Sequence, residues 1–220
     1  MNMRTFHIGI LVWCLGYSFS GHCAATVTVI DTFLPCSAGT AALPCEWKPS
    51  RRATGMFSLH LTPADRFISV SSRNDCTSLA RPVTLDTTYG FLKWKWRVWQ
   101  LPPLAREDKK NLNDSGAGVY VIFKARPPFN DIIKYVWSTT LPVGTSIASP
   151  YRNNSKVVVL ESGIGRLGQW IGETVDVRND YQRLFGSAAP LIQAIGILTD
   201  SDNTHSIARA DYGPFFAERK

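Results

Sequence analysis

The heptapeptide Leu92-Lys93-Trp94-Lys95-Trp96-Arg97-Val98 alternates strictly between apolar and basic side chains. Successive side chains of a β-strand point to opposite faces, so this period of two places both indoles on one face and all three cations on the other. A strand with one core face and one solvent face is typical of a packed antiparallel sheet. We therefore predict that Trp94 and Trp96 lie in a core and that the cations meet solvent.

The rest of the chain carries further strand signals, separated by turns rich in Gly, Pro, Asn and Ser. Including the segment around the heptapeptide, the expected strands cover residues 26–30, 57–61, 66–71, 91–99, 118–124, 131–137, 156–161, 172–176, 192–198 and 207–216. Short strands at this spacing predict an all-β, single-domain β-sandwich of jelly-roll type over residues 26–220. One short helix is expected at 181–185, with Asn179 or Asp180 as N-cap and Gly186 as its end.

The N-terminal residues have the pattern of a targeting signal. Arg4 precedes the apolar run 7–19, and Ala24 and Ala25 follow at a plausible cleavage point, which predicts a signal peptide over residues 1–25. No later segment reaches the roughly 20 consecutive apolar residues of a spanning helix, so we expect no transmembrane segment after signal removal. The expected location is periplasmic or secreted.

In an oxidising compartment outside the cytoplasm, cysteines can form disulfide bonds. Cys36 and Cys45 flank a short loop of small residues, and we predict a disulfide bond between them. Cys76 would then be unpaired. Pairing of Cys76 with either of the other two is the alternative, and retention of Cys23 would permit two bridges.

The chain is basic, with 24 Lys and Arg against 17 Asp and Glu and a net charge of +7. In an exported protein this excess favours acidic polysaccharide, lipopolysaccharide or phospholipid head groups as partners and gives no reason to expect nucleic acid. The row of Lys93, Lys95 and Arg97 is the candidate contact for anionic groups. For the row taken by itself, the preferred interpretation is that it protects a sheet face or edge from association, because one strand alone makes no pocket.

Aromatic side chains are candidates for flat platforms under sugar rings. Trp99 has the same strand parity as the basic row, Tyr135 and Trp137 share one parity on their own strand, and Trp170 follows a Gly-rich loop. We list Trp99, Tyr135 and Trp137 with the basic row as candidate ligand-binding residues.

An acidic turn follows the apolar strand 192–198, in the order Thr199-Asp200-Ser201-Asp202-Asn203-Thr204. Oxygen ligands of this kind suit a structural calcium ion, held by Asp200, Asp202 and Asn203. The same residue types also bond their own backbone in a hairpin corner that needs no ion, and this is the preferred interpretation.

Catalysis of glycosidic cleavage would need two carboxylates about 5 to 10 Å apart. The candidates are Glu161 together with Asp200 or Asp202. Glu173 and Asp176 lie three residues apart on one expected strand, so they should point to opposite faces and not act together. The sequence contains no complete catalytic signature.

Eight segments in order along the chain carry a resemblance to a known family. They are Leu43-Pro44-Cys45-Glu46-Trp47, Leu92-Lys93-Trp94-Lys95-Trp96-Arg97-Val98, Val119-Tyr120-Val121-Ile122-Phe123, Tyr135-Val136-Trp137, Ser149-Pro150-Tyr151, Val159-Leu160-Glu161-Ser162-Gly163, Asp180-Tyr181-Gln182-Arg183-Leu184-Phe185-Gly186 and Thr199-Asp200-Ser201-Asp202-Asn203-Thr204.

On these segments the chain resembles bacterial exported proteins that carry the domain of unknown function numbered 3047. The resemblance implies a bacterial envelope protein and no particular activity. The chain departs from the family pattern at Asn113-Asp114 and Gly118, where the family usually has a paired Asp and an Arg, and at Pro214, where it usually has Asp.

These observations together lead to a ranked expectation. The first hypothesis is an exported envelope protein that binds an anionic glycan or another envelope component on a sandwich surface. The second is a carbohydrate-active hydrolase or lyase. The third is a structural envelope protein without a ligand.

Overall fold

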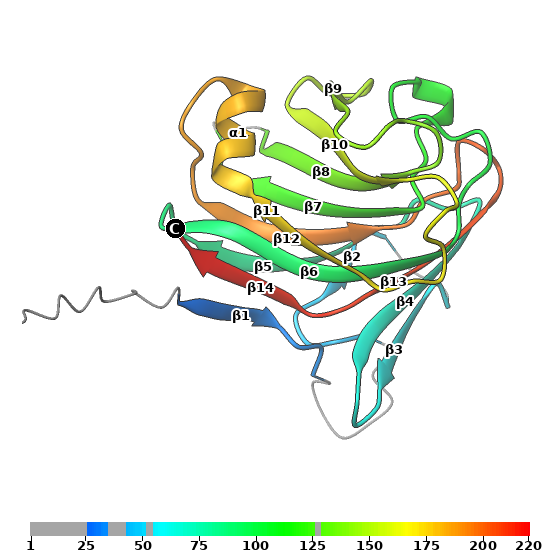
Figure 1. The fold of residues 1–220 in the computed structure, drawn as a ribbon, viewed down its shortest axis with the longest axis horizontal. Helices are drawn as coiled ribbons and strands as arrows, with labels where there is room; N and C mark the ends of the chain where they lie inside the picture. Colours follow the sequence, from blue (N-terminus) through cyan, green and yellow to red (C-terminus); the bar gives the residue numbers. More distant parts are fainter. Residues whose placement is uncertain (1–25, 35–42, 52–54, 126–128) are drawn as a thin grey trace, which may run out of the picture.

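The computed structural model describes residues 26–34, 43–51, 55–125 and 129–220 (Figure 1). Within these ranges two seven-stranded sheets and one α-helix are found. The helix lies beside one end of the sheets, and the hairpin of strands β3 and β4 extends away from it at the other end (Figure 1). The predicted all-β sandwich of jelly-roll type is confirmed.

The first sheet, called sheet A, is organised around its longest strand. Its spatial order is β1 (Val27–Asp31), β14 (Phe215–Arg219), β6 (Tyr89–Gln100), β13 (Ile207–Tyr212), β4 (Arg66–Arg73) and β3 (Phe57–Leu61), while β11 (Ile171–Asp176) pairs with the remaining edge of β6. β6 therefore pairs with three strands, and it contains the alternating heptapeptide.

The strand predicted over residues 207–216 is broken in the structure. β13 and β14 follow one another along β6, separated by Gly213 and Pro214. The Gly213 N–H still donates to the Lys95 carbonyl at 2.8 Å, but Pro214 has no N–H to donate. At this break sheet A divides, because β14 continues to β1 whereas β13 continues to β4 and β3.

The second sheet, called sheet B, has the order β2 (Lys48–Pro49), β5 (Leu79–Leu85), β12 (Ile192–Leu198), β7 (Ala117–Phe123), β8 (Asp131–Ser138), β10 (Ser155–Ser162) and β9 (Ser146–Ala148). Its described pairs are antiparallel except for the parallel pair of β8 and β10. The sequence analysis missed β5, which contains Pro82, and also β2 and β9, which are too short to show a period.

The core lies between the two sheets and confirms the alternation in β6. Leu92, Trp94, Trp96 and Val98 are at most 3% exposed. From sheet B, the Trp137 ring packs 6.2 Å from Trp96, measured between ring centroids. Burial of large aromatic side chains in this way is the main contribution to the stability of such a core.

The helix α1 (Val177–Phe185) begins earlier than predicted. Its N-cap is Asp176, whose Oδ1 accepts the Asn179 N–H at 3.0 Å, so neither Asn179 nor Asp180 caps it. The predicted end at Gly186 is confirmed, with φ at 75° in the left-handed region. Strand β11 runs directly into the helix, and this continuity hides the true start in the sequence. A short 3-10 turn, η1 (Lys110–Leu112), precedes β7.

Several expectations concern residues outside the described ranges. The predicted signal peptide 1–25 lies there, and so does Cys36 of the predicted Cys36–Cys45 disulfide. Cys76 is described and has a free thiol. Within the described ranges, no helix combines the length and apolar character needed to cross a membrane.

Candidate functional site

The basic row of β6 lies on the outer face of sheet A, as predicted, but each cation has an acidic partner. Lys93 pairs with Glu218 of β14. The Lys95 ammonium lies 2.8 Å from Asp65, and the Arg97 guanidinium lies 2.6 Å from Asp211. The row is therefore largely neutralised by its own protein, which corrects the picture of a bare basic stripe.

Arg97 is held between two indole rings. Its guanidinium carbon lies 4.3 Å from the Trp99 ring centroid and 4.4 Å from the Trp170 ring centroid. One oxygen of Asp211 accepts hydrogen bonds from Arg97 Nε, Arg97 Nη2 and Trp99 Nε1, the last at 2.8 Å. Trp99 is 50% exposed. We call Arg97, Trp99 and Trp170, fixed by Asp211, the indole platform.

Further rings extend the platform across sheet A. Phe67 on β4 contacts Trp170 edge-on, with 5.6 Å between ring centroids, and His60 on β3 stacks on Phe67 at 4.6 Å. The Lys95 ammonium lies 4.6 Å from the centroid of Trp170. Sequence reasoning missed Phe67 and His60, because only strand pairing across sheet A brings them to β6.

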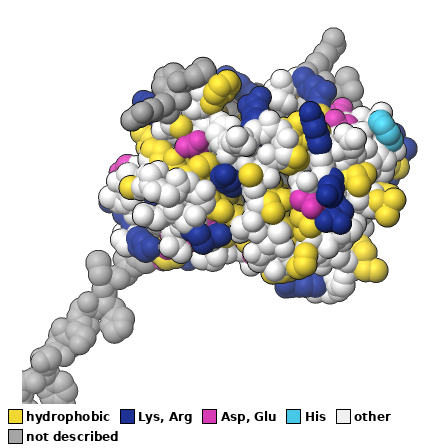
Figure 2. Space-filling model, turned by 90° about the horizontal axis from the view of Figure 1, so that it is seen from above, with side chains coloured by type: hydrophobic (Ala, Val, Ile, Leu, Met, Phe, Trp, Pro, Cys, Tyr) yellow, Lys and Arg dark blue, Asp and Glu magenta, His cyan; other side chains and the backbone are white. Residues whose placement is uncertain are grey.

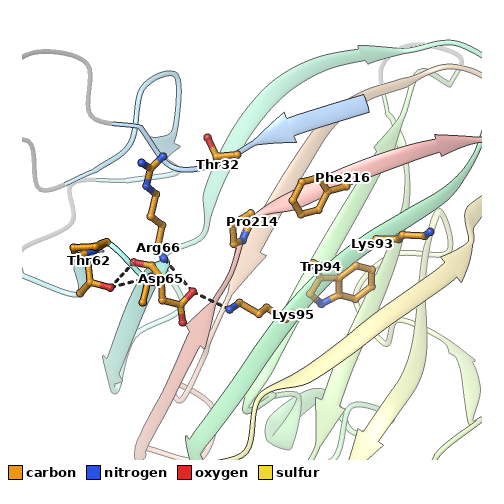
Figure 3. Close-up of a pocket in the computed structure, with 11 residues that line it drawn as sticks. Thr32, Thr62, Asp65, Arg66, Lys93, Trp94, Lys95, Pro214 and Phe216 are labelled. Atoms are coloured by element: carbon orange, nitrogen blue, oxygen red, sulfur yellow. Dashed lines mark hydrogen bonds and ion pairs between the residues drawn. The ribbon is translucent and has the colours of Figure 1, made fainter. Parts of the chain in front are cut away.

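A cavity of about 540 Å³ adjoins one end of the row, where sheet A divides at Pro214 (Figure 3). Its lining residues are Thr32, Thr62, Pro63, Ala64, Asp65, Arg66, Lys93, Trp94, Lys95, Pro214 and Phe216. Figure 3 shows Lys95 directed at Asp65, while the Arg66 guanidinium points away from both. Arg66 makes no ion pair with a described residue. Sequence reasoning missed Arg66, which carries no local motif.

A smaller cavity of about 210 Å³ adjoins the other end of the row, beside Trp99. Asp211, Arg209 and residues of β3 and β4 line it with Trp99. The outer face of β6 therefore carries a row of cations and rings with a hollow at each end. We call this whole region, from the Lys93 cavity to the Trp99 cavity, the β6 surface.

Two predicted platform residues lie elsewhere. Tyr135 and Trp137 are both 0% exposed in the core. The Tyr135 hydroxyl donates to Asp180 at 2.9 Å, and Trp137 Nε1 donates to the Gly163 carbonyl at 3.1 Å. Their shared parity was read correctly, but it is the inward parity of β8, so neither ring can meet a ligand.

The acidic turn closes on a residue that the calcium prediction did not include. Carboxylate oxygens of Asp114, Asp200 and Asp202 lie within 4.8 Å of one another. Asp114 accepts four hydrogen bonds, from the backbone and side chains of Asn203 and Thr204. Asn203 thus donates to Asp114, and hydrogen bonds to this carboxylate from another segment close the turn. The hairpin interpretation was wrong, because β12 lies in sheet B and β13 in sheet A, so the turn crosses between the sheets. A calcium site at Asp200, Asp202 and Asn203 stays a prediction.

The predicted catalytic combination is not brought together. Glu161 lies on β10, three strands away from β12 in sheet B, and its carboxylate pairs with Arg166 at 2.5 Å. At about 4.8 Å between neighbouring strands, the backbone of Glu161 lies about 14 Å from the strand that leads into the acidic turn. Its acidic neighbour is Glu173 on β11, whose carboxylate accepts the Trp96 Nε1–H at 3.0 Å. Burial raises the pKa of Glu173 to about 7, and the charge of Glu161 adds to this shift. The structure therefore replaces the pair of Glu161 with Asp200 or Asp202 by Glu161 with Glu173.

Comparison with known proteins identifies a family to which the sequence matches and several solved structures of low sequence identity. The model of a family described as "Protein of unknown function (DUF3047)" matches residues 46–216. No curated protein matches the chain.

The solved structures that resemble this chain include a carbohydrate-binding module, a xyloglucanase domain and an endoglucanase. The family 11 carbohydrate-binding module from Clostridium thermocellum, in complex with a β-1,3-1,4-mixed-linked tetrasaccharide, is 8% identical with a TM-score of 0.42, over 87% of this chain and 94% of that chain. The xyloglucanase domain of NopAA from Sinorhizobium fredii, with cellobiose, is 8% identical with a TM-score of 0.43, over 79% and 93%. Trichoderma harzianum endoglucanase 3 is 8% identical with a TM-score of 0.42, over 90% and 99%. At these identities and TM-scores, the ligands of those proteins carry no argument about the ligand of this chain.

Proposed function

We propose that this chain, which belongs to the DUF3047 family, is an exported glycan-binding protein that holds a polysaccharide on the β6 surface. The observation that carries the proposal is the indole platform. Trp99 is half exposed, yet its ring is fixed by the hydrogen bond to Asp211 and by the Arg97 guanidinium against its face. A flat apolar ring that is fixed before binding suits the C–H face of a sugar and loses little entropy on association.

The β6 surface also suits an elongated ligand. The 540 Å³ and 210 Å³ cavities lie at opposite ends of the outward row of β6, with the platform toward the second. Several shallow contacts in line fit successive units of a polymer better than one small molecule, which a single deep pocket would enclose.

The part of the β6 surface that would select acidic glycans is the cavity beside Lys93. The three cations of the row are paired with protein carboxylates, so they contribute little net charge. Arg66 adds a guanidinium without an ion pair, and guanidinium groups bind carboxylates in a bidentate manner. An acidic polysaccharide or a lipopolysaccharide, met in the periplasm or outside the cell, supplies such groups.

A second candidate function is a carbohydrate-active hydrolase. It is favoured by the pair of Glu161 and Glu173, because a carboxyl group that keeps its proton near neutral pH beside a second carboxylate is the pattern of glycosidic acid–base chemistry. Under this alternative the purified protein releases reducing ends from a polysaccharide and Glu173→Gln abolishes the release. Under the binding proposal no reducing ends appear.

The binding proposal is tested on an array of neutral and acidic glycans with three variants. Trp99→Ala should weaken every bound glycan by roughly tenfold, equivalent to about 1.4 kcal/mol. Arg66→Gln should weaken only the acidic ones. Phe129→Ala removes a ring that is also exposed, at 60%, but lies off the β6 surface, and should have no effect.

The control for Arg66 is Arg73→Gln, at the other end of the same strand and exposed. An array that stays silent with the wild-type protein would reject the function. Equal binding by wild type and Trp99→Ala would reject the platform as the site.

A further inference from the structure

Lys134 is the one described cation of sheet B that lies near the middle of the sheet and makes neither an ion pair nor a hydrogen bond through its ammonium. It lies on β8 between the inward residues Ile133 and Tyr135, so its side chain points to the outer face of the sheet. Its cross-strand partner on β7 is Tyr120, and the ammonium lies 4.9 Å from the centroid of that ring. The Tyr120 hydroxyl also has no hydrogen-bond partner among the described residues.

Placing Lys134 in this position costs stability. Burial lowers the pKa of Lys134; the charge of Asp200 opposes the shift and that of Arg152 adds to it. A largely buried ammonium without a hydrogen-bonded partner is unfavourable, and a cation–π contact at 4.9 Å recovers only part of the lost hydration. By contrast, the three cations on β6 are each paired with an acid. The fold itself therefore gives no reason for a lysine here.

Both unpaired groups remain within reach of a small molecule. Among described residues, the polar side-chain atoms that are sealed from solvent without a hydrogen-bond partner belong to Arg81, Trp94, Ser155 and Glu218. The Lys134 ammonium and the Tyr120 hydroxyl have no hydrogen-bond partner and are not among these atoms, so each group, although largely buried, keeps some contact with solvent.

The outer face beside Tyr120 is floored by small residues. Gly196 of β12 lies opposite Tyr120, and Ala80 of β5 lies opposite Gly196. These residues put no long side chain over the sheet next to the phenol. This floor lies on the side of Tyr120 away from Lys134, because β7 stands between β12 and β8. A small ligand on it can contact the Tyr120 hydroxyl and extend past the ring to the Lys134 ammonium, which lies 4.9 Å from the ring centroid.

We propose that Lys134 and Tyr120 form a second ligand site, on the opposite sheet from the β6 surface, which binds a small ligand through a carboxylate or phosphate group. The unpaired groups are donors, so the ligand must supply acceptors, and a charged acceptor gives the ammonium the counter-charge it lacks. The exposed Arg152, whose charge acts on Lys134, adds attraction for an anion.

The acids nearest this site do not oppose an anion as strongly as their number suggests. Asp200 is buried, and its Oδ1 already accepts the Ser115 N–H at 2.6 Å. Asp114 is surrounded by the four donors of the acidic turn.

The first test measures acylation of individual lysines of the full chain by acetic anhydride, read by peptide mass spectrometry. Glucuronate and inorganic phosphate are the two probes, each titrated until the acylation rate no longer changes. Glucuronate tests for a carboxylate ligand and inorganic phosphate for a phosphate ligand, and glucose is the neutral control. Acylation of Lys134 should slow roughly fivefold with at least one of the two anions and not with glucose. Lys156, on the neighbouring strand β10 with its ammonium over Phe185, should be unaffected. No protection by either anion, or equal protection of Lys156, overturns the site.

The second test uses Lys134→Met, which keeps an unbranched side chain and removes the ammonium group with its charge. The variant should lose the rise in Tm that the protective anion gives to the wild type, whereas Lys156→Met should keep it. Retention of that rise in Lys134→Met overturns the proposal. Trp99→Ala should leave the rise intact, so failure of this site and failure of the glycan-binding proposal are distinguishable.

Discussion

A single buried carboxylate, Asp211, organises the candidate glycan surface. It is 4% exposed, and its two oxygens accept bonds from Arg97, Trp99 and, at 2.6 Å, from the Ser69 hydroxyl. Three strands of sheet A thus meet at one side chain. The position of the half-exposed Trp99 ring depends on a charge that is hidden beneath it.

Replacing Asp211 with Asn should therefore damage stability and binding together. The variant leaves the Arg97 guanidinium, only 19% exposed, without its counter-charge, and breaking a buried pair on one side costs about 3 kcal/mol. Urea unfolding measures this loss. The matched control is Asp108→Asn, which breaks the more exposed Arg106–Asp108 pair and should cost no more than about 1 kcal/mol. Equal losses in the two variants would contradict the role given to Asp211.

Glu173 should give the protein a distinct pH dependence. Its pKa rises from 4.5 to about 7 on folding, because the site is buried and Glu161 lies near, while Arg166 opposes the rise. The folded state therefore binds the proton more tightly than the unfolded state. The stability this confers is complete below pH 4.5 and is lost as the pH rises through 7, by up to about 3 kcal/mol.

The measurement compares the free energy of unfolding of wild type and Glu173→Gln at several pH values from 4.5 to 8. Glutamine imitates the protonated carboxyl group, so the difference between the two proteins should grow in favour of the variant as the pH rises. Glu46→Gln, at a side chain that is 65% exposed, should run parallel to wild type. A constant difference between wild type and Glu173→Gln would show that Glu173 has an ordinary pKa.

At the level of elements, alternation predicted β6 well because both of its faces have a clear chemical identity. The bounds of β3 and β12 were also predicted correctly. For Tyr135 and Trp137 on β8 the period was right, but apolar and polar residues do not separate cleanly there, so the sequence does not say which face is inward. The acidic partners of the basic row could not be predicted from the sequence, because Asp65 and Asp211 come from a turn and from another strand.

The end of α1 allows a clean test of backbone conformation. Gly186 has φ at 75°, and a Cβ built on it would meet no atom within 4 Å, so a substitution there is strained by conformation alone. Gly186→Ala should destabilise the protein by about 1 kcal/mol in urea unfolding. Gly172→Ala, which also meets no atom within 4 Å but needs no positive φ, should be neutral or slightly stabilising. Similar losses at both positions would remove the conformational explanation.

For the whole molecule, net charge is a poor guide to where ligands bind. The chain carries +7, yet Figure 2 shows Lys and Arg side chains dispersed over one face among hydrophobic and uncharged groups. The basic row that stands out in the sequence is mostly paired, while Arg66 and Lys134, which carry no motif, are the cations left without an ion pair at the two proposed sites. An unpaired charge can be identified only from the folded structure, because only there are the ion-pair partners of the other charged side chains known.

The sandwich also predicts that its two outer faces act independently. The β6 surface lies on sheet A and the Lys134 site on sheet B, with the aromatic core between them. Substitutions that share no contacts usually add within about 0.5 kcal/mol. The double variant Trp99→Ala/Lys134→Met should therefore bind glycan like Trp99→Ala alone and respond to the protective anion like Lys134→Met alone. Calorimetric titration of the wild type, the single variants and the double variant measures the coupling. A coupling above about 1 kcal/mol would mean that binding on one face is transmitted through the core to the other, and the two faces would then not be independent.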